Sequence, residues 1–371
     1  MLSSLKNLTP LIDVRAPIEY KSGALPNSVN LPILFDDERD AVGKIYKKNG
    51  NQAAVEKGYE LVSGTIKQSR VTSWIDFIKE HPDTQLYCAR GGQRSQIAQA
   101  WLKEAGYEID LIPGGFKALR NICLTILEEV PNDDRSWIII SGRTGSGKTK
   151  LINVFDNAIC LESLANHRGS AFGGFNTPQP TSINFENSLA CDYLKISDNT
   201  VIFEDESRAI GRLVIPDKFF QKMSQSKIVL IEEPIENRIQ NIFEEYIQKG
   251  LENKTDTILS NELKEKLAKI SKRLGGANYK KVDTLIQSAF ENQDHSIHFE
   301  WIELLLTSYY DKMYDYQLER KQDRCIKSGN WEMIRNFLNF KFEKALNQNF
   351  EKKIWRDMLF TRFLFKGISN F

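Results

Sequence analysis

The sequence has 371 residues, enough for two or three domains, and its 41% apolar and 27% charged residues are typical of a globular protein. The formal net charge of +1 excludes a global basic field, so any nucleic-acid site must be a local patch. The start "MLSSLKNLTPLIDVRAP" lacks the apolar run of a signal peptide, and no later run approaches transmembrane length, so we expect no membrane association.

The first third of the chain alternates predicted strands with predicted helices. Short strands are predicted in "PLIDVRAPIEY" and "GALPNSVNLPI", and residues 36–80 have a helical pattern. "TQLYCARGGQRS" predicts a strand that leads into a loop, and "QIAQAWLKEAGY" predicts the amphipathic helix that follows. "IDLIPGGFKALRNICLTILEEV" repeats strand, glycine turn and helix. This alternation predicts a parallel-sheet α/β domain over residues 1–129.

A second α/β pattern follows the polar linker "VPNDDRS". Strands are predicted at "WIII", "NAICLES", "TVIFEDES" and "KIVLIEEP", which together predict an α/β domain over residues 130–235. From residue 236 the pattern is helical, and we expect residues 236–371 to form a helical portion that completes this second domain. Its last stretch is basic and rich in aromatic residues, including Phe342, Phe350, Trp355 and Phe360.

The octapeptide "CARGGQRS" places Cys88 at a strand end, before two glycines that let backbone amides point inward. We expect these amides, with Arg90 and Arg94, to lower the pKa of Cys88 and make it a thiolate near neutral pH. A thiolate in such a cradle can attack sulfur, selenium or phosphorus.

The other cysteines carry no catalytic pattern. Cys123 and Cys160 lie in apolar stretches and are predicted to be core residues, and Cys191 and Cys325 are given no role. Five scattered cysteines without zinc-type spacing predict a reducing, cytoplasmic location.

The segment "GRTGSGKT" follows the strand "WIII" and fits the pattern G-x-x-x-x-G-K-[ST] of a phosphate-binding loop, or P-loop. The candidate phosphate-binding residues are Gly142, Thr144, Gly145, Ser146, Gly147, Lys148 and Thr149. Thr149 and Asp205, which follows the strand "TVIFE", are candidate ligands for Mg²⁺. We expect no tightly bound cofactor, and the loop indicates phosphate binding without predicting ATP hydrolysis.

The N-terminal motifs resemble a known family of domains. "DVRAPIEYKSGALPNSVNLP" followed by "CARGGQRS" resembles the rhodanese domain, which carries sulfur or selenium on its loop cysteine. Five residues separate Cys88 from Arg94, one more than in many sulfur-transferring rhodaneses. The longer loop resembles that of the cell-cycle phosphatases with the same fold. Phosphatase chemistry therefore stays open, or the site admits something larger than a sulfur atom.

The order of the two domains resembles the tRNA 2-selenouridine synthases. The resemblance covers residues 8–335 and depends on the blocks "DVRAPIEY", "LPILFDDERDAVGKIYKKNG", "CARGGQRSQIAQAWL", "PGGFKALR", "GRTGSGKT", "LESLANHRGSAFG", "NTPQP", "FEDESRAIG" and "YYDKMYDYQL". It implies a tRNA substrate with 2-thiouridine at the wobble position, geranylation by geranyl diphosphate, and replacement of sulfur by selenium from selenophosphate.

The resemblance also suggests roles for the two loops. The P-loop would hold the diphosphate of geranyl diphosphate, while Arg90 and Arg94 would steady selenophosphate or its phosphate product. Cys88 would either carry selenium or help to expel the geranylthiol, and the sequence leaves both roles open.

A local basic stretch is the candidate tRNA contact. "KEKLAKISKRLGGANYKK" holds seven lysines and arginines, of which Lys269, Lys272 and Arg273 are the candidate phosphate-binding residues. Two other functions stay open on the residues alone. One is a P-loop kinase or phosphatase, and the other is a rhodanese-type sulfur-relay protein.

Overall fold

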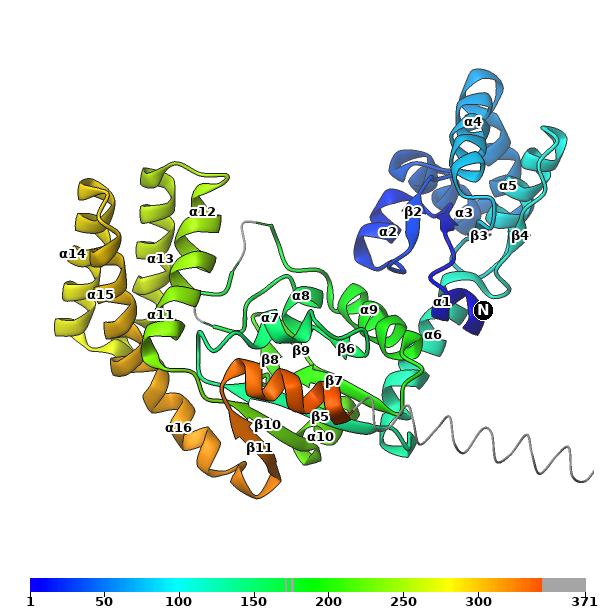
Figure 1. Ribbon diagram of the computed structural model, residues 1–371. Helices are drawn as coiled ribbons and strands as arrows, with labels where there is room; N and C mark the ends of the chain where they lie inside the picture. The colour runs from blue at the N-terminus through cyan, green and yellow to red at the C-terminus, as the bar shows by residue number, and fades with distance from the viewer. Residues whose placement is uncertain (171, 175–176, 342–371) are drawn as a thin grey trace, which may run out of the picture.

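The computed structural model describes residues 1–170, 172–174 and 177–341 (Figure 1). Two parallel sheets lie in successive parts of the chain, and a group of helices follows the second sheet. The N-terminal domain and helices α13–α15 lie at opposite ends of the molecule, with the second sheet between them (Figure 1). The α/β class predicted from sequence is confirmed.

The N-terminal sheet has the strand order β2-β1-β3-β4, and all its pairs are parallel. Its strands are β1 (Leu11–Asp13), β2 (Ser28–Asn30), β3 (Gln85–Tyr87) and β4 (Asp110–Leu111). The helices of this part are α1 (Leu2–Lys6), α2 (Pro17–Ser22), α3 (Asp36–Leu61), α4 (Gly64–Glu80), α5 (Gln93–Glu104) and α6 (Gly115–Glu128). Helix α3 is broken at Gly50, whose φ of 83° lies outside the helical region.

The second sheet has the order β11-β10-β5-β7-β6 and is also parallel throughout. Its strands are β5 (Ser136–Gly142), β6 (Ala158–Ile159), β7 (Thr200–Glu204), β10 (Lys227–Ile231) and β11 (Cys325–Gly329), and a separate hairpin joins β8 (Ala209–Ile210) to β9 (Leu213–Val214). The associated helices are the 3₁₀ turn Val130–Asn132, α7 (Lys148–Ile152), α8 (Leu161–Leu164), α9 (Ser182–Lys195) and α10 (Asp217–Gln225). Strand β5 is almost wholly buried, as expected for the central strand of a parallel sheet.

The remaining described residues are mainly helical. They form α11 (Ile235–Phe243), α12 (Lys249–Leu251), α13 (Asp256–Leu274), α14 (Gly276–Asn292), α15 (His295–Leu305) and α16 (Asp311–Glu319), with π-helical turns at Glu244–Gln248 and Leu306–Tyr310, a 3₁₀ turn at Gln322–Arg324 and a helix at 331–341. The prediction of a helical portion omitted β11, which pairs with β10 at the sheet edge. The segment "CIKSG" is short and has little apolar periodicity, so the sequence alone does not predict a strand there. The aromatic tail from Phe342 lies outside the described residues.

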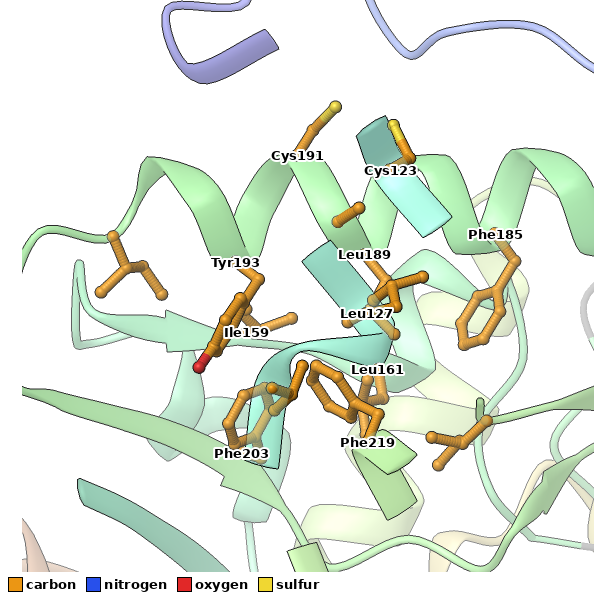
Figure 2. Packing of buried hydrophobic residues seen from close by; sticks show 14 of the residues in the cluster. Cys123, Leu127, Ile159, Leu161, Phe185, Leu189, Cys191, Tyr193, Phe203 and Phe219 are labelled. Atoms are coloured by element: carbon orange, nitrogen blue, oxygen red, sulfur yellow. The ribbon is translucent and has the colours of Figure 1, made fainter. Parts of the chain in front are cut away.

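Helix α9 joins the two sheet domains by packing against α6 and α1. Buried residues of both domains form one continuous cluster, in which Cys123 and Leu127 of α6 lie near Leu189 and Cys191 of α9 (Figure 2). The fully buried Asn187 donates to the Ala24 carbonyl (2.8 Å) and accepts from Arg120 (2.9 Å). The domains therefore share a core instead of meeting across a linker.

None of the helices that the structure describes is long and apolar enough to cross a membrane.

Candidate active site: a thiol loop and a phosphate loop

The first site is the loop between β3 and α5. Cys88 follows β3 directly, is 3% exposed, and its Sγ lies 3.2 Å from Ser95 Oγ. Gly91 has a φ of 64°, and a Cβ there would lie 2.7 Å from the amide nitrogen of Gly114. A Cβ on Gly115 would lie 2.1 Å from the Cys88 carbonyl oxygen. The loop therefore requires glycine because another backbone segment packs directly against it.

The thiol of Cys88 is poised to ionise. Burial raises its pKa, but hydrogen bonds from the Ser95 side chain and from the backbone amides of Arg90, Ser95 and Gly92 outweigh burial, so the net pKa is lowered. A lowered pKa increases the thiolate fraction near neutral pH, and the thiolate is the nucleophilic form. The role of Ser95 is not predicted from the sequence, although its position in "CARGGQRS" places it close to Cys88.

Arg90 and Arg94 have different surroundings. Both line a cavity of about 800 Å³ into which Cys88 also opens. Arg90 is exposed, whereas Arg94 donates to Glu19 Oε2 at 2.6 Å and to Glu19 Oε1 at 3.1 Å. The predicted trio thus lies at one cavity. Glu19, which fixes the Arg94 side chain, is not predicted from the sequence.

The second site is the P-loop between β5 and α7. Gly145 and Gly147 have φ values of 83° and 82°, and a Cβ on Gly145 would lie 2.7 Å from the Arg238 carbonyl oxygen. Lys148 Nζ donates to the Gly142 carbonyl at 2.7 Å, so its ammonium lies over the loop. Ser146 Oγ is buried without a hydrogen-bond partner. These features suit a loop that wraps an oxyanion, since the buried hydroxyl and the ammonium would both gain an acceptor.

Residues of the P-loop line a second cavity of about 520 Å³, from Thr144 to Lys150. Acidic residues also line this cavity. Thr149 Oγ1 donates to Glu162 Oε2 at 3.0 Å, and the Glu162 amide donates to Glu204 Oε1 at 2.7 Å. Burial raises the pKa of Glu204 to about 8, and burial together with the Glu162 charge raises the pKa of Glu206 to about 9. Glu162 is not among the site residues predicted from the sequence.

Asp205, one of the two predicted Mg²⁺ ligands, has a lysine partner. Lys321 Nζ lies 2.7 Å from each Asp205 carboxylate oxygen, and Ser141 donates to Oδ2 at 2.5 Å. Thr149 and Asp205 line the same cavity but bond to different groups. No group of three or more His, Cys, Asp or Glu side chains suited to a metal converges within the described residues. Mg²⁺ binding at this pair therefore stays a prediction, and a metal would compete with Lys321.

Helix α16 holds the P-loop from the other side. Arg238, with a 3% exposed side chain, pairs with Asp311 at 2.5 Å and donates through Nε to the Thr144 carbonyl at 2.9 Å. The Tyr314 hydroxyl accepts from the Gly142 amide at 2.5 Å. Asp311 and Tyr314 both belong to the segment "YYDKMYDYQL", so this segment contacts the P-loop directly and through Arg238.

The predicted tRNA contacts Lys269, Lys272 and Arg273 lie exposed near the C-terminal end of α13, and none of the three has an ion-pair partner within the described chain. Lys269 is close enough to His167 to influence its pKa, which burial lowers most strongly. The neighbouring Arg168 lines the P-loop cavity. Lys269 therefore lies near residues at the rim of that cavity.

A rhodanese-like domain with a loop thiol, joined through a shared core to a P-loop domain, defines a class of two-domain transferases. The rhodanese-like family model matches residues 1–121, and the model for the tRNA 2-selenouridine synthase AAA domain matches residues 135–345. This chain belongs to the tRNA 2-selenouridine synthase family, and it is accordingly an enzyme of the transferase class.

Three curated relatives with the name tRNA 2-selenouridine synthase illustrate the match. The protein of Sulfurovum sp. is 46% identical over 350 residues, which cover 91% of this chain and 96% of the relative. The protein of Shewanella frigidimarina is 43% identical over 345 residues, with 89% and 94% covered. The protein of Nitrosomonas europaea is 41% identical over 364 residues, with 89% and 94% covered. The match extends through both domains.

Proposed function

We propose that this chain converts wobble 2-thiouridine of tRNA to 2-selenouridine by way of an S-geranyl intermediate, using geranyl diphosphate and selenophosphate. The observation that carries the proposal is that one chain holds a thiol of lowered pKa and a P-loop in separate cavities. The two small substrates each bear phosphate, which suits two anion-binding loops. The family membership of the chain supports the selenium chemistry.

The geranyl step uses the P-loop. The sulfur of the base attacks the allylic carbon of geranyl diphosphate, a carbon–sulfur bond forms, and the carbon–oxygen bond breaks with its electron pair leaving on diphosphate. The amides of Gly145 and Gly147 and the ammonium of Lys148 neutralise that developing charge. Lys148 is available because its acceptor is the loop's own Gly142 carbonyl, which diphosphate would replace.

The selenium step uses the thiol loop. The selenium of selenophosphate adds to the base carbon that carries the S-geranyl group, and geranylthiol leaves from the same carbon. Water then takes the phosphoryl group as the selenium–phosphorus bond breaks, which releases phosphate and leaves selenium on the base. The thiolate of Cys88 adds to the base carbon and expels the geranylthiol, and it leaves in turn as selenium adds. The other role, in which Cys88 carries selenium as a perselenide, would require a two-electron oxidant, because the selenium of selenophosphate is already reduced. Arg90 and the backbone amides of the loop are suited to hold the phosphate that remains.

Mg²⁺ is the metal that the P-loop implies. The residues that would hold it are Thr149 and Asp205, with Glu206 beside them, and it would supply positive charge to the diphosphate. The raised pKa values of Glu204 and Glu206 suit a place where a cation offsets buried carboxylates.

The RNA would contact Lys269, Lys272 and Arg273, which are exposed and have no ion-pair partner among the residues that the structure describes. Such contacts with phosphates position the RNA without reading its sequence. From this end of α13 the anticodon loop would approach the P-loop cavity, because Arg168 and Lys269 lie near the same rim.

The test uses purified protein and an anticodon stem-loop that contains 2-thiouridine. Geranyl diphosphate is added alone and then with selenophosphate, and the nucleosides are identified by mass spectrometry for the wild type, Cys88→Ala and Lys148→Ala. We expect Cys88→Ala to make the geranyl adduct and to stop there, and Lys148→Ala to make neither product. Nucleotide turnover with no change in RNA mass would instead favour a kinase or phosphatase.

A further inference from the structure

The cavity beside Cys88 has an unusual composition for an anion-binding site. The two halves of α3, residues 36–49 and 51–61, form one wall, and the thiol loop with α5 forms the other. Apolar side chains dominate both walls, among them Val42, Tyr46, Val55, Tyr59, Ile97 and Trp101. A site for selenophosphate alone would need neither this volume of about 800 Å³ nor these walls.

We propose that this cavity binds the geranyl chain of the S-geranylated base and thereby presents the base carbon to the Cys88 loop. The inference rests on the proposed function and assigns a substrate subsite to it. Burial of a branched hydrocarbon chain against Val55, Ile97 and Trp101 stabilises the complex by about 25 cal/mol for each Å² removed from water. An unmodified 2-thiouridine lacks that chain and would bind here much more weakly.

The charges at the cavity suit a nucleotide that carries such a chain. Arg90 and Lys47 line it, are exposed, and have no ion-pair partner within the described chain. Arg39 and Lys44 also line it, but each has a carboxylate partner, Glu19 and Asp40 respectively. Apolar walls beside the cations of Arg90 and Lys47 match an apolar group attached to an RNA phosphate backbone.

The P-loop cavity suits the geranyl chain of the S-geranylated base less well than the Cys88 cavity does. Its aromatic residues, such as Tyr309 and Tyr310, lie among charged side chains that include Glu162, Arg168 and Glu206. A hydrocarbon there would cost these charges hydration. The apolar recess beside it, lined by Trp301 and Tyr310, measures only about 30 Å³. That volume is about the share of one water molecule in the liquid. The Cys88 cavity is therefore far larger than that recess.

Gly58 offers a way to fill the cavity without breaking the fold. It lines the wall formed by α3, and a Cβ there would meet only Val42 Cγ2, at 4.0 Å. A leucine at this helical position also removes the backbone flexibility of glycine, which favours the helix. Glu56→Leu places the same side chain on the same helix, at an exposed position outside the cavity.

The experiment supplies a stem-loop that has been geranylated chemically, with a 2-thiouridine stem-loop as its counterpart. Two quantities are measured for the wild type, Gly58→Leu and Glu56→Leu. The first is formation of 2-selenouridine from the geranylated RNA. The second is protection of Cys88 from iodoacetamide, measured by mass spectrometry of the peptide that contains Cys88. We expect Gly58→Leu to lose selenation by about tenfold or more and to lose the protection, while Glu56→Leu retains both. Only the geranylated RNA should protect the wild type.

Two results would overturn the proposal. One is equal protection of Cys88 by the two RNAs, and the other is wild-type selenation of geranylated RNA by Gly58→Leu. Either leaves the proposed function intact, because the wild type would still form the product. Failure of the proposed function has a different signature, in which the wild type selenates neither RNA and makes no geranyl adduct from geranyl diphosphate.

Discussion

The ammonium of Lys321 lies 2.7 Å from both carboxylate oxygens of Asp205, at the end of β7 that faces the P-loop. The lysine supplies positive charge at the place where a P-loop protein holds its metal. Replacement by methionine should leave the 13% exposed Asp205 carboxylate without a cation. We expect Mg²⁺ to raise the melting temperature of Lys321→Met more than that of the wild type, measured by scanning fluorimetry. An equal response would mean that Lys321 does not compete with the metal.

The pH dependence of Cys88 is a second prediction. Because hydrogen bonds lower its pKa despite burial, its alkylation by iodoacetamide should reach half its maximal rate at a lower pH than that of an ordinary cysteine. Ser95→Ala removes the side-chain hydrogen bond to the thiolate, so the midpoint should rise and the rate at neutral pH should fall. Mass spectrometry of the Cys88 peptide measures this. A midpoint unmoved by Ser95→Ala would show that the backbone amides suffice.

Asp311 is expected to stabilise the P-loop through Arg238. In Asp311→Asn the buried guanidinium loses its counter-charge, and the protein should lose about 3 kcal/mol of unfolding free energy. Affinity for inorganic diphosphate should also fall, because Arg238 contacts the backbone at Thr144. Urea unfolding and titration calorimetry provide the two measurements.

Asp315→Asn is the matched control for Asp311→Asn. Asp315 pairs with Arg143, but both side chains are about half exposed, at 49% and 45%. Exposed ion pairs contribute about 1 kcal/mol or less. A stability loss as large as that of Asp311→Asn would contradict the conclusion that the buried pair of Arg238 and Asp311 stabilises the P-loop.

The raised pKa of Glu204 predicts that the stability of the protein depends on pH. Its pKa in the folded protein is about 8, whereas the carboxyl of an unfolded chain titrates near about 4.3. Unfolding between these values releases a proton, so this group makes the folded state less stable as pH rises through the window. The contribution is on the order of 5 kcal/mol across the whole window. Glu204→Gln keeps the neutral form, and its stability should decline less than that of the wild type between about pH 5 and pH 8.

Urea unfolding of both proteins at several pH values tests this prediction. Parallel stability curves for the wild type and Glu204→Gln would show that Glu204 ionises normally. Saturating Mg²⁺ provides a second comparison. A cation bound near Glu204 would favour the charged carboxylate and reduce the difference between the two curves.

The basic end of α13 predicts salt-dependent RNA binding. Alanine at Lys269, Lys272 and Arg273 should weaken tRNA binding for all sequences and reduce the slope of log affinity against log salt by up to about 3, since each phosphate contact contributes about 0.9. Filter binding over a range of salt concentrations measures the slope. The control removes three exposed lysines elsewhere, Lys79, Lys103 and Lys218. An equal effect of both triple variants would show that only net charge matters.

The local sequence was enough to predict the conformation of the two loops. Each consists of a strand, glycines and a helix start within about ten residues, and the positive φ values of Gly91, Gly145 and Gly147 require glycine at those positions. The α/β class followed from strands alternating with helices. These features depend on neighbours in the chain, which a single sequence displays.

The partners of the predicted residues could not be predicted. Glu19 meets Arg94 across 75 positions, and Lys321 meets Asp205 across 116 positions. Nothing in the spacing of either pair signals the contact, because a tertiary approach brings them together. The edge strand β11 was missed for the same reason, since it forms only against β10.

The core that α6 and α9 share has a consequence for how the RNA is handled. The cavities at Cys88 and at the P-loop have no lining residue in common, and the packed interface leaves no linker about which one could swing toward the other. If both reactions occur, the wobble nucleotide itself must travel, either by pivoting within a bound anticodon loop or by leaving and returning. Escape of geranylated RNA into solution would then compete with selenation at every turnover. The ratio of the two modified nucleosides would report how fast the nucleotide moves relative to how fast the RNA dissociates.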